Sequence, residues 1–180
     1  MTQRFNTGIF GRGLSGKTTL ARELSREWNR KFHMDTLAYI VNGDEVGAWD
    51  KERHVEVFTD ECEFWQKVWA THGQVVIVEE AAVTIARERD LIPVFTTLRH
   101  NEHRLIVVGH SGMELLPAMR QSFQTLYLFR QDEDTCKVWA KAMLDKGIMA
   151  AMNLEQYYFL RSQVWKPSET RSFKLSLSCD

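Results

Sequence analysis

One stretch decides the fold of this chain: Gly11-Arg12-Gly13-Leu14-Ser15-Gly16-Lys17-Thr18, which matches the pattern G-x-x-x-x-G-K-[ST] in full. A mainly apolar segment, residues 5–10, precedes it and reads as a strand. Residues 17–32 follow and predict a helix, because apolar side chains recur every four residues at Leu20, Leu24 and Trp28. A glycine-rich turn between a strand and a helix is typical of a loop that binds the phosphates of a nucleotide.

The residue types in this loop suit a nucleoside triphosphate, and we expect ATP with Mg²⁺. Glycines let backbone N–H groups turn toward phosphates, and the start of the helix adds a partial positive charge. Lys17 is expected to reach the β- and γ-phosphates, and the Thr18 hydroxyl is expected to ligate Mg²⁺. The predicted nucleotide-binding residues are Gly11, Arg12, Gly13, Leu14, Ser15, Gly16, Lys17, Thr18 and Thr19.

Two carboxylates follow the continuous apolar run Val75-Val76-Ile77-Val78. Such a run predicts a strand buried on both faces of a parallel sheet, whose carboxyl end faces the crevice where these sheets bind ligands. Glu79 is therefore expected to hold Mg²⁺, and Glu80 to polarise the attacking water. The usual residue at the first position is Asp, so the role of Glu79 is less firmly indicated. A solvated acidic turn is the competing interpretation.

The rest of the pattern alternates strands with helices. Further strands are predicted at 39–41, 105–108 and 126–129, with a turn at 42–47. Helices are predicted at 60–71, 81–89, 93–100, 113–121, 132–144 and 153–165, followed by a polar tail with a strand-like stretch at 173–177. The sequence therefore predicts one α/β domain over residues 1–180, a mainly parallel sheet sandwiched between helices. Its core would span about 5–145, and a C-terminal helix and tail 146–180.

Composition excludes several classes of function. The net charge is −1 and the sequence pI is near 6.6, so any DNA contact must come from a local patch or from several copies acting together. Three widely spaced cysteines form no zinc pattern, and His100 and His103 lack companion ligands. No apolar run approaches a membrane span, and the N-terminus lacks the apolar stretch of a signal peptide. We therefore expect a cytoplasmic protein without direct membrane insertion.

In the order and spacing of its blocks, the chain resembles the FtsK/HerA superfamily of DNA-translocating P-loop ATPases, with a RecA/FtsK-HerA-like core. Within it, the likeness is greatest to the genome-packaging ATPases of internal-membrane bacteriophages and related archaeal viruses. The resemblance rests on the loop and on three later blocks, 75–81, 98–110 and 115–130. It implies an ATPase motor that moves double-stranded DNA into a capsid as a homo-oligomeric ring. Capsid vertex proteins would be partners, and the host cytoplasm or the virion its location.

The resemblance also implies roles for two later residues. Arg99 matches the family's arginine finger, which in a ring would reach the nucleotide of a neighbouring subunit. A surface arginine is the alternative, and Arg87, Arg89 and Arg120 are rivals for the role. His110 falls where the family usually carries a glutamine that senses the γ-phosphate. Either His110 or Ser111 could take over that hydrogen bond, or His110 could simply end a strand.

Other functions and other residues remain open at this stage. A small-molecule or nucleoside kinase would also suit a P-loop chain of 180 residues, although Arg87-Glu88-Arg89 makes a poor lid. A nucleotide-dependent switch without turnover is a third class. Trp28, Trp65 and Trp139 read as core residues, whereas Trp49 lies in a polar segment, 43–53, that could be an exposed lip or a DNA contact.

Overall fold

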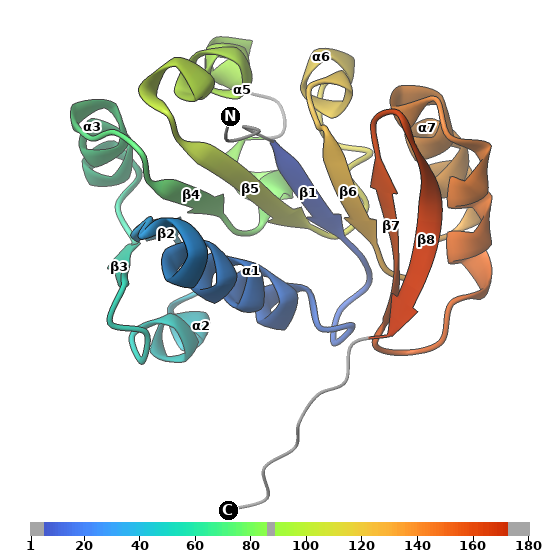
Figure 1. The fold of residues 1–180 in the computed structure, drawn as a ribbon, viewed down its shortest axis with the longest axis horizontal. Coiled ribbons are helices and arrows are strands. Elements are labelled where there is room, and N and C mark those ends of the chain that lie inside the picture. Colours follow the sequence, from blue (N-terminus) through green and yellow to red (C-terminus); the bar gives the residue numbers. More distant parts are fainter. Residues whose placement is uncertain (1–5, 86–88, 173–180) are drawn as a thin grey trace, which may run out of the picture.

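The computed structural model describes residues 6–85 and 89–172, which form an eight-stranded sheet with helices on both faces (Figure 1). The strand order is β3-β2-β4-β5-β1-β6-β7-β8; the first six run parallel, and β7 and β8 are antiparallel to their neighbours. The strands are β1 (Thr7–Phe10), β2 (Thr36–Tyr39), β3 (Val55–Phe58), β4 (Val75–Val78), β5 (Arg104–Gly109), β6 (Thr125–Leu128), β7 (Tyr158–Gln163) and β8 (Lys166–Ser172). This confirms the predicted α/β class with a mainly parallel sheet.

The helices fall on two faces of the sheet. The α-helices α1 (Lys17–Phe32) and α2 (Gly43–Trp49) pack on one face. The other face carries α3 (Glu61–Ala70), α4 (Ala81–Thr84), α5 (Ile92–Thr97), α6 (Pro117–Gln121) and α7 (Glu133–Met143). Three 3₁₀ helices complete the described chain: η1 (Arg89–Leu91), η2 (Leu98–Asn101) and η3 (Lys146–Asn153). The predicted sandwich of helices around the sheet is confirmed.

Two hydrophobic clusters, one on each face, hold the layers together. Because side chains alternate along a strand, Ile9 of β1 enters the cluster under α1 while Phe10 enters the cluster under α7. All four residues of β4 are fully buried, as the unbroken apolar run at 75–78 predicted. The central strands are therefore fixed from both sides, and their carboxyl ends are held in one row.

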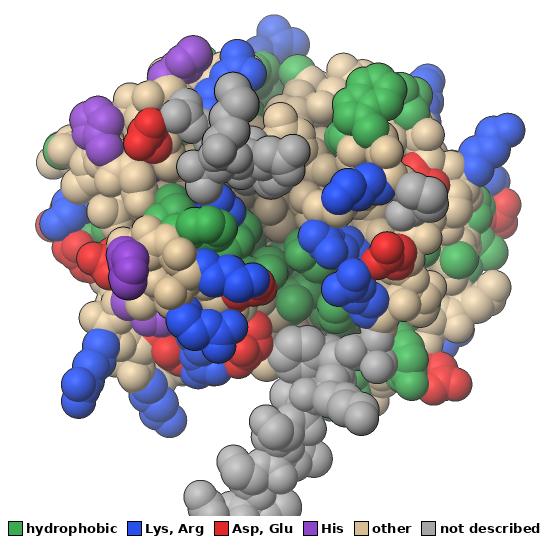
Figure 2. Space-filling model, viewed as in Figure 1, with side chains coloured by type: hydrophobic (Ala, Val, Ile, Leu, Met, Phe, Trp, Pro, Cys, Tyr) green, Lys and Arg blue, Asp and Glu red, His purple; other side chains and the backbone are tan. Residues whose placement is uncertain are grey.

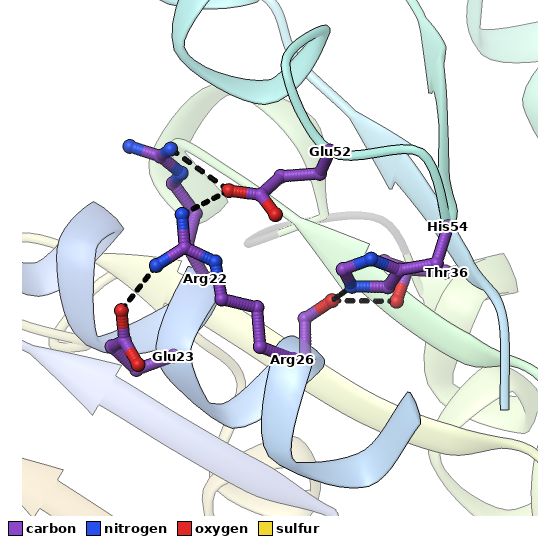
Figure 3. A network of polar contacts seen from close by, with 7 residues as sticks. Arg22, Glu23, Arg26, Thr36, Glu52 and His54 are labelled. Atoms are coloured by element: carbon purple, nitrogen blue, oxygen red, sulfur yellow. Dashed lines mark hydrogen bonds and ion pairs between the residues drawn. The ribbon is translucent and has the colours of Figure 1, made fainter. Parts of the chain in front are cut away.

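Polar contacts fix α1 against the segment that precedes β3. Figure 3 shows Arg22 and Arg26 of α1 converging on Glu52, with Arg22 Nη2 3.0 Å from Glu52 Oε1. Between these two arginines in α1, the Ser25 hydroxyl lies 2.7 Å from Thr36 Oγ1 and 2.8 Å from His54 Nε2. These contacts set the position of α1, whose first turn carries the predicted phosphate-binding residues.

Several predicted boundaries were right because local signals specify them. The predicted helix at 17–32 is α1, and the helices at 60–71 and 132–144 are α3 and α7. The side chain of Asp60 accepts a hydrogen bond from Glu63 N, and that of Asp132 from Thr135 N. Both aspartates thus satisfy N–H groups that the first helical turn leaves without partners.

The region between β2 and α3 differs from its prediction. The expected turn at 42–47 is the start of α2, which Asn42 caps by accepting a hydrogen bond from Asp44 N. The expected strand at 39–41 lies earlier, at Thr36–Tyr39, and β3 was not predicted. Trp49 is fully buried in the cluster under α1, so its side chain is neither exposed nor available to DNA, whereas the role of the rest of segment 43–53 stays a prediction. Most residues of segment 43–53 are polar, so the sequence did not indicate that α2 has one apolar face.

The C-terminal region also differs. The predicted helix at 153–165 is wrong, because residues 158–163 form β7, which pairs with β6 on one side and β8 on the other. The core therefore extends past residue 145, since Leu160 of β7 is buried in the cluster under α7. Helix α4 is shorter than the predicted 81–89, and α6 begins only at Pro117. The strand-like stretch at 173–177 lies outside the described residues.

Candidate nucleotide-binding site

The predicted loop lies between β1 and α1, at the carboxyl edge of the sheet, and lines a pocket of about 660 Å³. Residues from five parts of the chain meet there. The lining consists of Gly13, Leu14, Ser15, Gly16, Lys17, Thr18, Thr19, Glu45, Glu79, Glu80, His110, Gln156 and Tyr157. Gly11 and Arg12 precede this lining and form the start of the loop.

Glycine is required at both ends of the loop. Gly16, the residue before α1, has φ +100°, a backbone conformation that other residues rarely adopt. A Cβ atom on Gly11 would lie 2.5 Å from Phe129 Cβ, so a side chain there would displace the adjoining strand end. Gly11 N–H donates to the Gly109 carbonyl oxygen at 3.2 Å and so anchors the start of the loop, whose later N–H groups can turn toward a ligand.

Lys17 lies across the loop that it follows. Its side chain is mostly buried, and Nζ donates a hydrogen bond to the carbonyl oxygen of Arg12 at 3.0 Å. Burial lowers the pKa of the Lys17 ammonium, and the carboxylates of Glu80 and Glu79 act in the opposite direction. The ammonium is thus placed between the loop and the acidic end of the pocket, where the terminal phosphates of a bound nucleotide would lie.

Glu79 presents a buried carboxylate to the first turn of α1. It is 2% exposed, Oε2 lies 3.4 Å from Thr18 Oγ1, and Oε1 is a buried atom without a hydrogen-bond partner. Burial, reinforced by the charge of Glu45, raises the pKa of Glu79 to about 8. A divalent cation would offset this burial and occupy the unpartnered oxygen, because carboxylate and hydroxyl oxygens are ligands that Mg²⁺ prefers. The residues present therefore fit a magnesium ion between Thr18 and Glu79.

Glu80 and His110 approach the pocket from the ends of β4 and β5. Glu80 has φ +52°, which turns its side chain into the pocket directly after the strand. His110 Nε2 lies 3.5 Å from Glu80 Oε2. The segment is fixed by Gln131 Nε2, which donates to the His110 carbonyl oxygen at 2.6 Å. Of the two candidate sensors, His110 lines the pocket, whereas the Ser111 hydroxyl donates to Glu114 at 2.7 Å.

The structure does not bring Arg99 into the pocket of its own chain. Arg99 lies in η2, before the amino end of β5, whereas the loop follows the carboxyl end of β1, which runs parallel to β5. The six residues of β5 separate the two ends by roughly 20 Å, at ~3.3 Å per residue. Arg120, a rival, donates hydrogen bonds to the carbonyls of Met113 and Leu115. Arg87 lies outside the described residues.

Three residues of the pocket were not identified from the sequence: Glu45, Gln156 and Tyr157. Glu45 belongs to α2, which had been read as a turn, and Gln156 and Tyr157 lie in a segment read as helix. No local signal distinguishes them, because they reach the loop only through the packing of α2 and β7. Within residues 6–85 and 89–172, no group of three or more His, Cys, Asp and Glu side chains forms a metal site of its own.

The sheet order together with a glycine loop between β1 and α1 defines the P-loop NTPase fold. In fold, the chain is similar to the genome packaging NTPase B204 from Sulfolobus turreted icosahedral virus 2, solved with AMPPCP. The TM-score is 0.75 at 14% identity, covering 96% of this chain and 100% of that one. Comparisons with protein-family models and with curated proteins find no match.

Two further solved structures share the fold. The N-terminal domain of zonular occludens toxin from Neisseria meningitidis has a TM-score of 0.59 at 13% identity, covering 98% of this chain and 96% of that one. The cytoplasmic domain of the type VII secretion ATPase EccC from Thermomonospora curvata has a TM-score of 0.67 at 10% identity, covering 96% of this chain and 24% of that one. All three neighbours support the predicted P-loop fold.

Proposed function

We propose that this chain is an ATPase motor of the P-loop class that translocates double-stranded DNA, packaging a viral genome into a capsid as a homo-oligomeric ring. One observation carries the ATPase part: the loop, a buried carboxylate and a second carboxylate converge on one pocket. The DNA part is supported by the similarity in fold to a genome packaging NTPase, which covers 96% of this chain and 100% of that one. The chain would act in the host cytoplasm or on the virion. The described part contains no helix long and apolar enough to cross a bilayer.

Each pocket residue has a role in this proposal. The loop from Gly11 to Thr19 holds the phosphates through its backbone N–H groups, and Lys17 offsets their charge. Thr18 and Glu79 would hold Mg²⁺, which would neutralise charge on the phosphates. Glu80 accepts a hydrogen bond from the attacking water and takes its proton. His110, 3.5 Å from Glu80, responds to the terminal phosphate at the same end of the pocket.

As an arginine finger, Arg99 could act only on the nucleotide of a neighbouring subunit. Arg99 lies at the opposite edge of the sheet from the loop, so its guanidinium serves another chain's nucleotide if it serves any. A ring places the edge of one subunit against the pocket of the next. The guanidinium stays charged and can pair with two phosphate oxygens at once, which suits this role.

A local basic groove supplies the DNA contact that the near-neutral chain otherwise lacks. The groove, about 510 Å³, lies beside α1 between β6 and β8 and is lined by Arg26, Arg30, Arg161 and Arg171. Figure 2 shows Lys and Arg side chains gathered around a hollow at the centre of this face. Two acidic residues, Glu23 and Glu27, also line it, and Arg26 and Arg171 form ion pairs with Glu52 and Glu169, so DNA phosphates would have to compete with these carboxylates. In a ring, several such grooves would add their charge along one duplex.

The proposal predicts that duplex DNA stimulates ATP hydrolysis. Phosphate release by the purified chain is measured with and without duplex DNA, and with a panel of nucleosides as acceptors. We expect DNA to raise the rate several-fold. Phosphorylated nucleoside without free phosphate would instead identify a kinase, and nucleotide binding with negligible turnover under all conditions would identify a switch protein. Either result would overturn the motor.

The proposal that Arg99 acts on the nucleotide of a neighbouring subunit can be tested separately. An Arg99→Ala variant and a Lys17→Ala variant are each expected to be inactive, because one lacks the finger and the other the charge that holds the γ-phosphate. Mixed together, they should regain partial activity, since some subunit pairs then combine an intact Lys17 with an intact Arg99. Labelled subunits establish that mixed rings have formed. No recovery in mixed rings would exclude Arg99 as the finger.

A further inference from the structure

The order of the strands determines which end of the pocket is acidic and which end faces β7. Glu79 and Glu80 follow β4, His110 follows β5, the loop follows β1, and Gln156 and Tyr157 precede β7. In the sheet these strands stand in the order β4-β5-β1-β6-β7, so the loop lies between the acidic groups and the Gln156–Tyr157 segment (Figure 1). A triphosphate that extends its terminal phosphate toward the carboxylates must therefore extend its nucleoside toward β7.

The segment before β7 is built against the loop. Gln156 Nε2 donates to the Leu14 carbonyl oxygen at 3.2 Å, a contact between residues 142 positions apart. Tyr157 has φ +65°, a left-handed backbone conformation that residues with a side chain rarely adopt. A Cβ atom on Gly16 would lie 3.6 Å from Tyr157 Cδ1, so the ring stands directly beside the last glycine of the loop. Surrounding contacts hold the tyrosine in this unfavourable conformation.

The ring is also partly open to solvent. Tyr157 is 37% exposed and lines the pocket, although an aromatic side chain of this size gains more free energy when it is covered. We propose that Tyr157 binds the nucleoside of the bound nucleotide, by stacking its ring on the base. This inference rests on the proposed function, from which it takes that the ligand is a nucleotide. An aromatic ring offers such a contact without any polar group, because every base presents a flat π face.

The test separates the nucleoside from the phosphates. Dissociation constants for ATPγS and for inorganic tripolyphosphate, both with Mg²⁺, are measured by calorimetry for the intact chain and its variants. Tyr157→Ala is expected to weaken ATPγS binding about tenfold, because a base–aromatic stack is lost, and to leave tripolyphosphate binding unchanged. Tyr157→Phe should bind both ligands as the intact chain does, since stacking needs the ring and not the hydroxyl.

Tyr158 provides the matched control. It is the next residue, is 39% exposed, and belongs to β7, where it pairs with Ser172 of β8. It does not line the pocket. Tyr158→Ala should therefore change neither constant. An equal loss for both ligands in Tyr157→Ala, or no loss for either, would overturn the stacking role while the proposed ATPase function stands. If the intact chain binds neither ligand, the nucleotide site itself is refuted, and the inference with it.

Discussion

Glu80→Gln is expected to lower the kcat of ATP hydrolysis about a thousandfold, within the range typical for a lost general base. An amide has the size of the carboxylate but cannot take a proton from water. Glu80 lies at the end of β4 with its side chain 30% exposed, so the substitution leaves the loop and the buried Glu79 in place. The Kd for ATP, measured by calorimetry, should therefore stay within about twofold, because phosphate binding depends on the loop N–H groups and Lys17.

A control variant distinguishes this role from a general loss of negative charge. Glu56 of β3 is a more exposed glutamate outside the pocket, with its side chain 51% exposed, and Glu56→Gln should leave kcat unchanged. Full turnover in Glu80→Gln would show that another carboxylate polarises the water. Glu45, which also lines the pocket, would then be the next candidate.

Glu79→Gln should act differently, because a variant that loses a metal ligand needs more Mg²⁺ for the same rate.

Trp139→Ala is expected to destabilise the fold by about 3–5 kcal/mol, the usual cost of removing a large buried aromatic side chain. Trp139 is fully buried, and its ring lies 4.8 Å from that of Phe10 in β1. Nε1 donates to the Ser111 carbonyl oxygen at 2.7 Å, so the substitution also removes the hydrogen bond to this partly buried acceptor. The free energy of unfolding is measured by urea titration, with the slope of the transition as a check on two-state behaviour.

Trp165 provides the control variant for the loss of stability expected in Trp139→Ala. It is 96% exposed at the turn between β7 and β8, so Trp165→Ala should change the free energy of unfolding by less than about 0.5 kcal/mol. If Trp139→Ala does not fold at all, Trp139→Phe retains most of the ring and should lose roughly 1–3 kcal/mol. Equal stability of the two Trp→Ala variants would show that the core around Phe10 does not depend on Trp139.

Much of the candidate site could be predicted from the sequence because its components are local. The loop is one uninterrupted stretch whose residue types each answer a requirement of phosphate binding, and α1 begins where its last glycine ends. Glu79 and Glu80 could be predicted as candidate site residues because a fully apolar run indicates a buried parallel strand, whose carboxyl end faces the binding crevice. The role of Arg99 stays a prediction, since it depends on a second copy of the chain.

The P-loop and the strands at the centre of the sheet could be predicted, since contiguous residues specify them. The packing of the chain brings Thr18 to Glu79 across 61 positions, Glu45 of α2 to the pocket, and Tyr157, just before β7, to the loop. The reason is physical. A strand is stabilised by whichever strand pairs with it, and in residues 158–163 the apolar run stops after Leu160 and gives no sign of the pairing partner. Which residues share a pocket is then set by the order of strands in the sheet, and no local pattern encodes that order.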